Sequence, residues 1–230
     1  MKFKHIFFDL DRTLWDFEIN SHSTLEELFS TFNLKAKGVK KSDDFIRIYK
    51  EHNEKLWGLY RVKKISQIDL RRERFQRTLA DFGIHDFALA EAIGEQYISI
   101  CPKKSQLFPH STEVLEYLSE KYKLHIITNG FHKVQHVKLK YANLTKYFDA
   151  IITSEKVGVM KPNPKIFEFA LETANAKSSE TVYIGDDLEV DILGCQNCGM
   201  DGIYFNPKRE KHAEKITFEI NCLSQLKELL

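Results

Sequence analysis

The sequence lacks the features that mark membrane, secreted and nucleic-acid-binding proteins. No stretch approaches the roughly 18 apolar residues of a membrane span, and the apolar run near the start is too short for the core of a signal peptide. Thirty-four basic residues stand against thirty-three acidic ones, so the basic excess of a protein that holds nucleic acid by its phosphates is missing. We therefore expect a cytoplasmic protein with no nucleic-acid and no membrane partner, in an oligomeric state that the sequence leaves open.

Cysteine is scarce as well, with four residues in the chain. Cys195 and Cys198 have a spacing that occurs in zinc and redox sites. No second pair and no cysteine–histidine group completes a tetrahedral zinc site beside them. We interpret the pair as small residues packed on a helix, whose thiols stay free in a reducing compartment.

The remaining composition is that of an ordinary globular protein, with 43% hydrophobic and 29% charged residues. This balance excludes a disordered tail and a coiled coil. At 230 residues, the chain is long for one domain and short for two. The length favours one large domain that carries a sizeable insertion.

Five short apolar runs predict buried strands at residues 5–8, 124–127, 150–152, 181–184 and 202–205. Continuous apolar runs of this length are typical of strands that are covered on both faces. Helical patterns lie between the runs in the second half of the chain. We therefore predict an α/β fold: a Rossmann-like parallel sheet with helices on both faces.

Residues 15–105 contain no convincing strand and four helical patterns. Thr24 and Glu27 have the spacing of a capping box, which would start the first helix. The second helix is expected to start at 42–44, the third to span 66–82 and the fourth to span 86–100. The second would bury a stripe made of Phe45, Ile48, Tyr49, His52, Leu56 and Tyr60. We expect 15–105 to form an inserted helical domain, and 1–14 with 106–230 to form the α/β core.

Acidic and polar residues stand where the predicted strands end. They are Asp9, Asp11 and Thr13 after the first strand, Thr128, Asn129 and Gly130 after the second, and Asp186, Asp187 and Asp191 after the fourth. Functional groups of an open parallel sheet gather at this edge. Up to five carboxylates would converge there, two of them four residues apart on one helix face, where like charges repel unless a cation neutralises them. Oxygen ligands without histidine or cysteine favour Mg²⁺ over zinc.

Each of these residues also has a purely structural explanation. Asp187 could cap the following helix, Asp11 and Thr13 could close a turn, and Gly130 could supply an unusual backbone angle. Because these residues occur together at successive loops, a functional site explains them better than independent structural roles do.

Four motifs, in this order, resemble those of the haloacid dehalogenase superfamily. They are Asp9-x-Asp11-x-Thr13-Leu14, Thr128-Asn129-Gly130, Lys161-Pro162 and Gly185-Asp186-Asp187-x-x-x-Asp191. The match covers the whole predicted core, and the helical insertion resembles the C1 cap of that superfamily. Within it, the chain is most similar to pyrimidine 5′-nucleotidases of the YjjG type. The segments that carry this likeness are 127–131, 154–158 and 161–167, and more loosely Leu56-Trp57-x-x-Tyr60 and Arg74-Phe75.

The resemblance implies an Mg²⁺-dependent phosphohydrolase that works through an aspartyl-phosphate intermediate. Asp9 would be the nucleophile, and Asp11 would protonate the leaving oxygen and then activate the hydrolytic water. The phosphoryl oxygens would be held by Thr128, by the backbone N–H groups of Asn129 and Gly130, and by Lys161. The metal ligands would be Asp9, Asp186 and the Asp11 carbonyl, with Asp187 or Asp191 helping directly or through water.

The substrate implied by the resemblance is a small phosphate ester, and the closest likeness points to a pyrimidine nucleoside 5′-monophosphate. Another phosphate ester, such as a sugar phosphate, is the main alternative. A 2-haloacid dehalogenase would lack the second acid, Asp11, and a catalytically silent binding module would have lost Asp9 or Asp11. In the insertion, Trp57 and Tyr60 could stack on a base or belong to the core. Arg74 could bind a base carbonyl or solvate a helix face.

Overall fold

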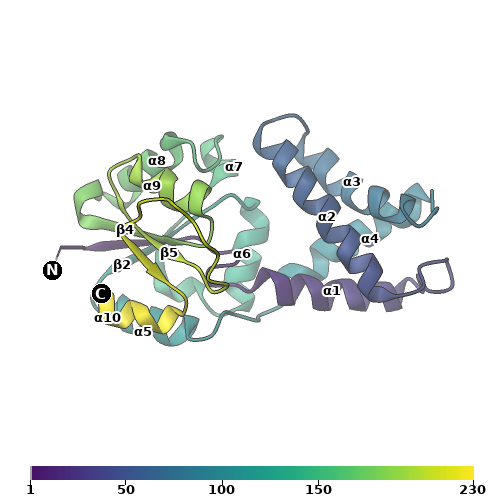
Figure 1. Cartoon of the computed structure of the whole chain (residues 1–230), viewed down its shortest axis with the longest axis horizontal. Coiled ribbons are helices and arrows are strands. Elements are labelled where there is room, and N and C mark those ends of the chain that lie inside the picture. The colour runs from purple at the N-terminus through teal and green to yellow at the C-terminus, as the bar shows by residue number, and fades with distance from the viewer. Residues whose placement is uncertain (1) are drawn as a thin grey trace. The chain divides into compact units, whose positions relative to one another are not determined.

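The computed structural model describes residues 2–230 and divides them into two compact units. One unit comprises the chain up to Phe17 together with Lys104–Leu230, and the other is Glu18–Lys103 (Figure 1). The sequence analysis places the corresponding boundaries after residues 14 and 105. We refer to the two as the core unit and the helical unit, and each is described by itself.

The core unit is built on one parallel sheet. Its strands in the described part of the chain are β1 (His5–Phe8), β2 (Lys123–Thr128), β3 (Phe148–Thr153), β4 (Thr181–Gly185), β5 (Asp201–Phe205) and β6 (Phe218–Ile220). Their spatial order is β3-β2-β1-β4-β5-β6, and every neighbouring pair is parallel. This confirms the predicted Rossmann-like sheet. The sequence analysis missed β6, a three-residue edge strand with only Ile220 buried, because so short a run shows no period.

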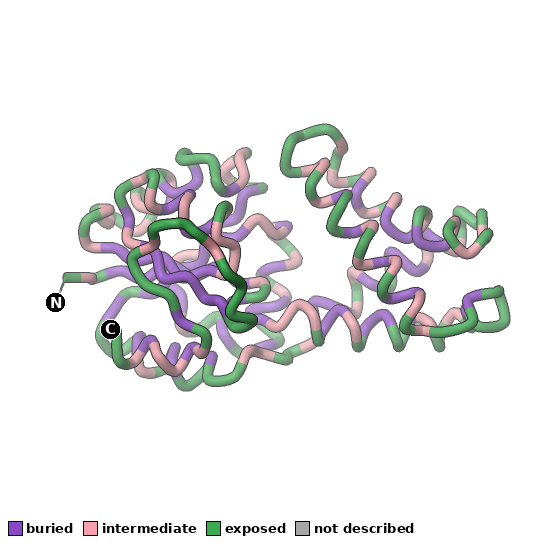
Figure 2. Tube along the Cα trace, viewed as in Figure 1, coloured by how far each residue is buried: buried purple, intermediate pink, exposed green. Residues whose placement is uncertain are grey.

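Helices cover both faces of this sheet (Figure 1). They are α5 (Ser111–Ser119), α6 (His132–Tyr141), α7 (Ser154–Val157), α8 (Pro164–Ala174), α9 (Gly194–Gln196) and α10 (Leu226–Leu229). On one face, Phe7, Ile127 and Tyr183 join Ile166 and Phe167 of α8 in a buried cluster. Successive residues of a strand alternate between the two faces of the sheet. The residues directly before and after these three in their strands therefore point to the second face. Double coverage explains why β1 and β4 are buried throughout. Figure 2 shows the buried residues gathered in the interior of the core unit.

The helical unit contains α1 (Phe17–Thr31), α2 (Ser42–Arg61), α3 (Gln67–Ala80) and α4 (Phe87–Ile100). The predicted capping box at Thr24 is wrong, because α1 begins seven residues earlier. Thr24 lies inside the helix, where its hydroxyl donates to the Asn20 carbonyl at 2.8 Å. Asparagine and serine before Thr24 are poor residues for a helix interior, which hid the first two turns. The third helix, predicted over 66–82, is α3, and Ser66 caps it in a capping box with Asp69.

Three aromatic rings fill the interior of the helical unit. The centroid of Tyr49 lies 4.8 Å from that of Phe75 and 5.5 Å from that of Tyr97. The predicted stripe of α2 is confirmed at Phe45, Tyr49 and Leu56, which are buried. His52 is half-buried, however, and Asn53 occupies the buried position beside it. A polar residue therefore lies within the apolar stripe.

The two closely spaced cysteines are free thiols in the core unit. Cys195 is buried, and its sulfur donates to the Ile192 carbonyl at 3.2 Å. Cys198 is half-buried near the Pro164 carbonyl. Both side chains are packing elements.

None of the helices within residues 2–230 combines the length and apolar character needed to cross a bilayer.

A buried histidine pair predicts acid sensitivity of the core unit. His5 Nδ1 lies 3.1 Å from His125 Nε2, and the His125 ring stacks on Phe7. Burial lowers the pKa of His125 to about 4. The unfolded chain therefore binds a proton that the folded chain excludes as the pH falls below 6.5, and stability decreases in this range. We expect the unfolding free energy of the wild type, relative to His125→Gln, to fall by about 2 kcal/mol between pH 7 and pH 4.5. Denaturant titrations at each pH measure this difference; parallel curves for the two proteins would contradict it.

Candidate active site

The site begins at the carboxyl end of β1, the central strand of the sheet. Asp9 follows β1 directly, and its backbone N–H donates to the Ile184 carbonyl of β4 at 2.9 Å. The strand order reverses here, because β1 lies between β2 on one side and β4 on the other. Such a switch point leaves a crevice where ligands bind in open α/β sheets. Asp9 is buried at its edge.

Lys161 connects Asp9 to the neighbouring strands. Its ammonium donates to Asp9 Oδ1 at 2.7 Å and to Asp191 Oδ1 at 2.6 Å. It also lies 2.8 Å from the Tyr183 hydroxyl and 3.0 Å from the Ile127 carbonyl. Burial by itself would lower the pKa of Lys161, but the two carboxylates outweigh it and raise the pKa above its ordinary value. Lys161 is therefore a fixed positive charge. The sequence analysis missed Tyr183, whose only signal is a hydroxyl on a buried strand.

Three of the predicted carboxylates meet in one cluster. Oxygen atoms of Asp9, Asp186 and Asp191 lie within 4.8 Å of one another, and Thr13 donates to Asp186 at 3.2 Å. Burial, opposed by Lys161, raises the pKa of Asp9 to about 7. Burial, together with Asp9 and Asp191, raises the pKa of Asp186 well above its ordinary value. The cluster holds more negative charge than one lysine balances, and its donors are all carboxylate oxygens, so these residues fit Mg²⁺.

Asp187 lies outside this cluster. A π-helical turn begins at Leu188, and Asp187 caps it by accepting from the backbone N–H groups of Glu189 and Val190. The prediction that Asp187 and Asp191 share a helix face is therefore wrong, because only Asp191 lies within the turn. Asp191 accepts from the Asp187 N–H and points to Lys161. Gly185 makes this possible, since a side chain there would overlap the Asp191 carboxylate.

Asp11 is held by two residues that the sequence analysis missed. Gln135 Nε2 donates to Asp11 Oδ2 at 2.7 Å, and the Lys138 ammonium binds Oδ1. Lys138 is buried and also lies 4.1 Å from the centroid of the Trp15 ring. Both donors lie on α6, three residues apart and thus on one face. That spacing of polar residues directly after Thr128-Asn129-Gly130 was the available signal.

The loop after β2 is tied to the loop that carries Lys161. The Asn129 side chain accepts from the Lys161 N–H at 2.8 Å and donates to the Lys161 carbonyl at 3.1 Å. The Gly130 N–H donates to the buried Thr128 hydroxyl at 3.0 Å. A side chain at Gly130 would overlap the amide of Gln135. The structure thus brings the four predicted phosphate-binding residues into two loops that support each other.

The three predicted specificity residues all belong to the helical unit. Trp57 and Tyr60 are half-buried on α2, with their rings edge to face and centroids 5.7 Å apart. Arg74 of α3 is buried, with its guanidinium 4.8 Å from the centroid of the Tyr97 ring. The interpretation of Arg74 as a solvated surface residue is therefore wrong.

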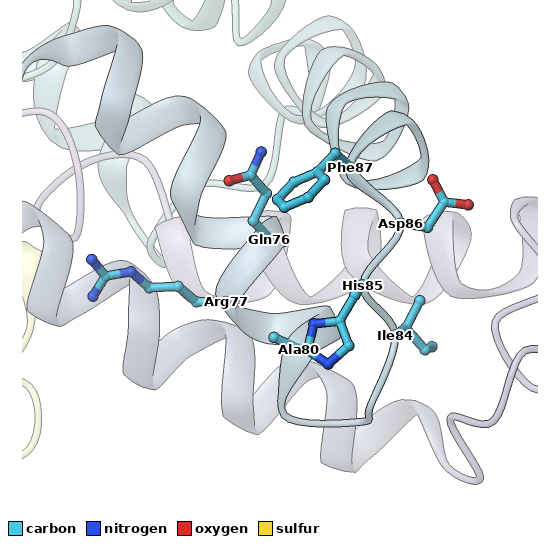
Figure 3. A pocket seen from close by; sticks show the side chains of 7 residues that line it. All are labelled: Gln76, Arg77, Ala80, Ile84, His85, Asp86 and Phe87. Atoms are coloured by element: carbon cyan, nitrogen blue, oxygen red, sulfur yellow. The ribbon is translucent and has the colours of Figure 1, made fainter.

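Two surface hollows of the helical unit carry none of the predicted site residues. The smaller, of about 190 Å³, is lined by Gln76, Arg77, Ala80, Ile84, His85, Asp86 and Phe87 (Figure 3). Asp86 caps α4, and Arg77 pairs with Glu73. In Figure 3, Arg77 and Asp86 point to opposite sides rather than toward a common ligand. The larger, of about 350 Å³, is lined by His22, Asp43, Ile46, Arg47, Lys50, Glu51 and Glu54. Its lysine and arginine are paired with glutamates. The acidic cluster of the core unit remains the stronger candidate.

Comparison with known proteins agrees with this site. Residues 3–199 match the haloacid dehalogenase-like hydrolase family. The pyrimidine 5′-nucleotidase YjjG of Escherichia coli is 34% identical over all of this chain and 99% of its own. A glyceraldehyde 3-phosphate phosphatase of Methanothermobacter thermautotrophicus is 31% identical over 99% of both chains. The crystal structure of the HAD-hydrolase YfnB from Bacillus subtilis, bound to magnesium, has a TM-score of 0.89 at 26% identity, covering 100% of this chain and 99% of that one.

The acidic switch-point cluster, the fixed lysine and these full-length matches lead to one assignment. One of these relatives is named a pyrimidine 5′-nucleotidase and the other a glyceraldehyde 3-phosphate phosphatase. Both names agree with a site in which Lys161 holds the buried Asp9 and Gln135 holds Asp11. The chain therefore belongs to the haloacid dehalogenase-like hydrolase family and is a phosphoric monoester hydrolase.

Proposed function

We propose that the protein is an Mg²⁺-dependent nucleoside 5′-monophosphatase that prefers pyrimidines and works through an aspartyl-phosphate. The observation that carries the chemistry is the pairing of buried Asp9 with Lys161, beside an Asp11 that two donors hold in place. The observation that favours a nucleotide is the full-length similarity to YjjG. The second candidate, a sugar phosphatase, is favoured by the similarity to the glyceraldehyde 3-phosphate phosphatase.

In the first half of the reaction, an Asp9 oxygen attacks phosphorus and forms an acyl phosphate. The bond from phosphorus to the ester oxygen breaks, and that oxygen takes a proton from Asp11. Lys161 holds Asp9 Oδ1 and would orient the carboxylate for attack. Thr128 and the N–H groups of the following two residues would hold the equatorial oxygens as charge spreads over them.

In the second half, Asp11 takes a proton from water, and the resulting hydroxide attacks phosphorus. The bond between phosphorus and the Asp9 oxygen breaks, which releases phosphate and restores the carboxylate. Gln135 and Lys138 bind both oxygens of the Asp11 carboxylate. They would hold the side chain in place while it accepts the proton. The same residue thus serves as acid and base in turn.

The carboxylates of Asp9, Asp186 and Asp191 would hold the metal, and the Asp11 carbonyl would complete the protein ligands. Bound Mg²⁺ would neutralise negative charge that otherwise repels an incoming phosphate. Asp191 already accepts from Lys161 and from the Asp187 N–H, so we assign it a supporting part. Asp9 and Asp186 are the principal ligands in this proposal.

Removal of the metal should abolish activity. We expect exhaustive chelation to stop hydrolysis of an aryl phosphate and added Mg²⁺ to restore it. Asp186→Asn should raise the Mg²⁺ concentration for half-maximal activity at least ~10-fold. Asp187→Asn should leave that concentration and the stability nearly unchanged, because the asparagine side-chain oxygen can still cap the helical turn. Magnesium titrations and thermal melts of both variants provide the measurement. Full activity after chelation, or an equal response of the two variants, would contradict the assignment.

A substrate panel tests the preference for pyrimidines. We expect kcat/KM for uridine and thymidine 5′-monophosphates to exceed that for purine nucleotides and sugar phosphates by at least ~10-fold, because a pocket sized for one ring excludes two. Trp57→Ala should raise KM for the pyrimidine nucleotide about 10-fold relative to an aryl phosphate, through loss of stacking on the base. If triose or hexose phosphates surpass every nucleotide, the nucleotidase proposal fails and the phosphatase assignment stands.

A further inference from the structure

The ammonium group of Lys161 is surrounded by more acceptors than it has hydrogens. Four oxygen atoms lie within 3.0 Å of its nitrogen: Asp9 Oδ1 at 2.7 Å, Asp191 Oδ1 at 2.6 Å, the Tyr183 hydroxyl at 2.8 Å and the Ile127 carbonyl at 3.0 Å. An ammonium group donates three hydrogen bonds. One of the four oxygens therefore receives no hydrogen from Lys161.

The Tyr183 hydroxyl resolves this mismatch, because it is the one group of the four that both accepts and donates. Besides Lys161, it contacts the Ile127 carbonyl at 3.1 Å and Asp191 Oδ1 at 3.2 Å. If the ammonium uses its three shortest contacts, the hydroxyl accepts from Lys161 and donates to the Ile127 carbonyl. Every oxygen then has a hydrogen, and each donor uses its shortest contacts.

The place of Tyr183 in the fold separates the role of its ring from that of its hydroxyl. The residue is fully buried in β4, within the apolar cluster on one face of the sheet. Its ring packs edge to face on Phe167, with centroids 5.7 Å apart, and a phenylalanine would pack in the same way. A buried hydroxyl costs free energy unless it is hydrogen-bonded, and the contacts of this one go to Lys161 and two of its partners.

We infer that Tyr183 is a positioning residue that sets the direction in which Lys161 donates to the Asp9 carboxylate. The three N–H bonds of an ammonium keep fixed angles, so anchoring one of them stops rotation of the group and directs the other two. A neutral hydroxyl supplies this anchor without drawing the charge of Lys161 away from Asp9. The inference rests on the proposed function, in which Lys161 orients Asp9 for attack, and it adds the residue that orients Lys161.

Tyr183→Phe tests this role, because it removes the hydroxyl and keeps the ring. Lys161 can turn its third hydrogen to the Ile127 carbonyl, so we expect the variant to fold. That turn moves the hydrogen that Asp9 accepts. At saturating Mg²⁺, kcat should fall about 10-fold while KM stays within a factor of about two, since attack is misaligned and substrate contacts remain.

Two further readouts distinguish this effect from a loss of the general acid. The loss should be equal for an aryl phosphate and a nucleotide, because Asp11 still protonates the leaving oxygen. In acid-quenched single turnovers, the rate at which Asp9 becomes phosphorylated should fall by the same factor as kcat.

Tyr122→Phe is the matched control. Tyr122 is a buried tyrosine just before β2, at the end of the sheet opposite the site, and its hydroxyl donates to the Leu230 carbonyl at 2.6 Å. The substitution removes the same atom and one buried hydrogen bond. It should leave kcat and KM at their wild-type values, and thermal melts of the two variants compare their stability.

A double-mutant cycle with Lys161→Met identifies the residue through which Tyr183 acts. In the Lys161→Met background, Tyr183→Phe should change the rate less than ~2-fold, because a residue that works only through Lys161 has nothing left to position. A contribution of Tyr183 to core packing would lower the rate equally in both backgrounds. Should Lys161→Met prove inactive, the comparison of Tyr183→Phe with Tyr122→Phe still decides the question.

The outcomes separate this inference from the proposed function. Wild-type kcat in Tyr183→Phe would overturn the inference, and so would an equal loss in the two backgrounds or a raised KM with unchanged kcat. If the wild type yields no phosphorylated Asp9 although it hydrolyses aryl phosphate, the proposed mechanism itself fails.

Discussion

Asp9→Asn should reduce turnover of every substrate below detection, a loss of at least ~10⁵-fold. The amide cannot form the covalent intermediate, and Asp9 is the carboxylate that Lys161 orients at the end of β1. The measurement is the rate of hydrolysis of an aryl phosphate and of uridine 5′-monophosphate. Acid quenching of the wild type during turnover should yield a phosphorylated peptide that contains Asp9, and the variant should yield none.

The matched control is Asp149→Asn, which changes an exposed aspartate of β3 in the same way. It should retain wild-type turnover. Thermal melts establish that Asp9→Asn is folded, which we expect because Lys161 keeps its contact with Asp191. Residual turnover of Asp9→Asn within ~10²-fold of the wild type would show that another group attacks phosphorus.

Asp11→Asn should lower kcat by roughly 10²–10⁴-fold, the usual contribution of a general acid–base group. The loss should be large for a nucleotide, whose leaving alkoxide needs a proton, and small for an aryl phosphate, whose phenolate leaves without one. The asparagine oxygen can still accept from Lys138, and the Gln135 amide can turn so that its oxygen accepts from the new NH2 group, so the loop should keep its conformation. A plot of rate against leaving-group pKa measures the difference.

Lys138→Met refines this test, because it leaves the Asp11 carboxyl in place and removes the cation between it and Trp15. We expect a loss of up to ~10²-fold, as is typical of a misplaced catalytic group, with the same dependence on the leaving group. If Asp11→Asn slows good and poor leaving groups equally, Asp11 is not the acid.

The sheet and the motif residues of the core unit were predictable because the backbone determines both. β1 and β4 are buried on both faces, so they read as continuous apolar runs. Residues directly after parallel strands must meet at one edge, which places Asp9 beside Asp186 whatever the side chains do. The helix that starts at Ser66 was predictable for a similar reason, since a capping box lies within four residues of sequence.

The residues that the sequence analysis missed depend on contacts between distant segments. Gln135 and Lys138 bind Asp11 across 124 and 127 residues. Their spacing places them on one helix face but does not identify the residue that they bind. Tyr183 looks like any buried strand residue until Lys161 is placed against its hydroxyl. Of the five carboxylates predicted at this edge, Asp9, Asp186 and Asp191 meet in one cluster. Local N–H groups bind Asp187, and two residues of α6 bind Asp11.

The two glycines of the site restrict how this sequence can drift over generations. A side chain at Gly130 would take the space of the Gln135 amide, and one at Gly185 would take that of the Asp191 carboxylate. Each neighbour lies on the helical segment that follows its glycine, and each already has a partner, Asp11 in one case and Lys161 in the other. Positions 130 and 135, and positions 185 and 191, therefore form two linked pairs. A larger residue at Gly130 therefore requires a smaller one at position 135, and a larger residue at Gly185 requires a smaller one at position 191. Related sequences should carry both changes of a pair or neither.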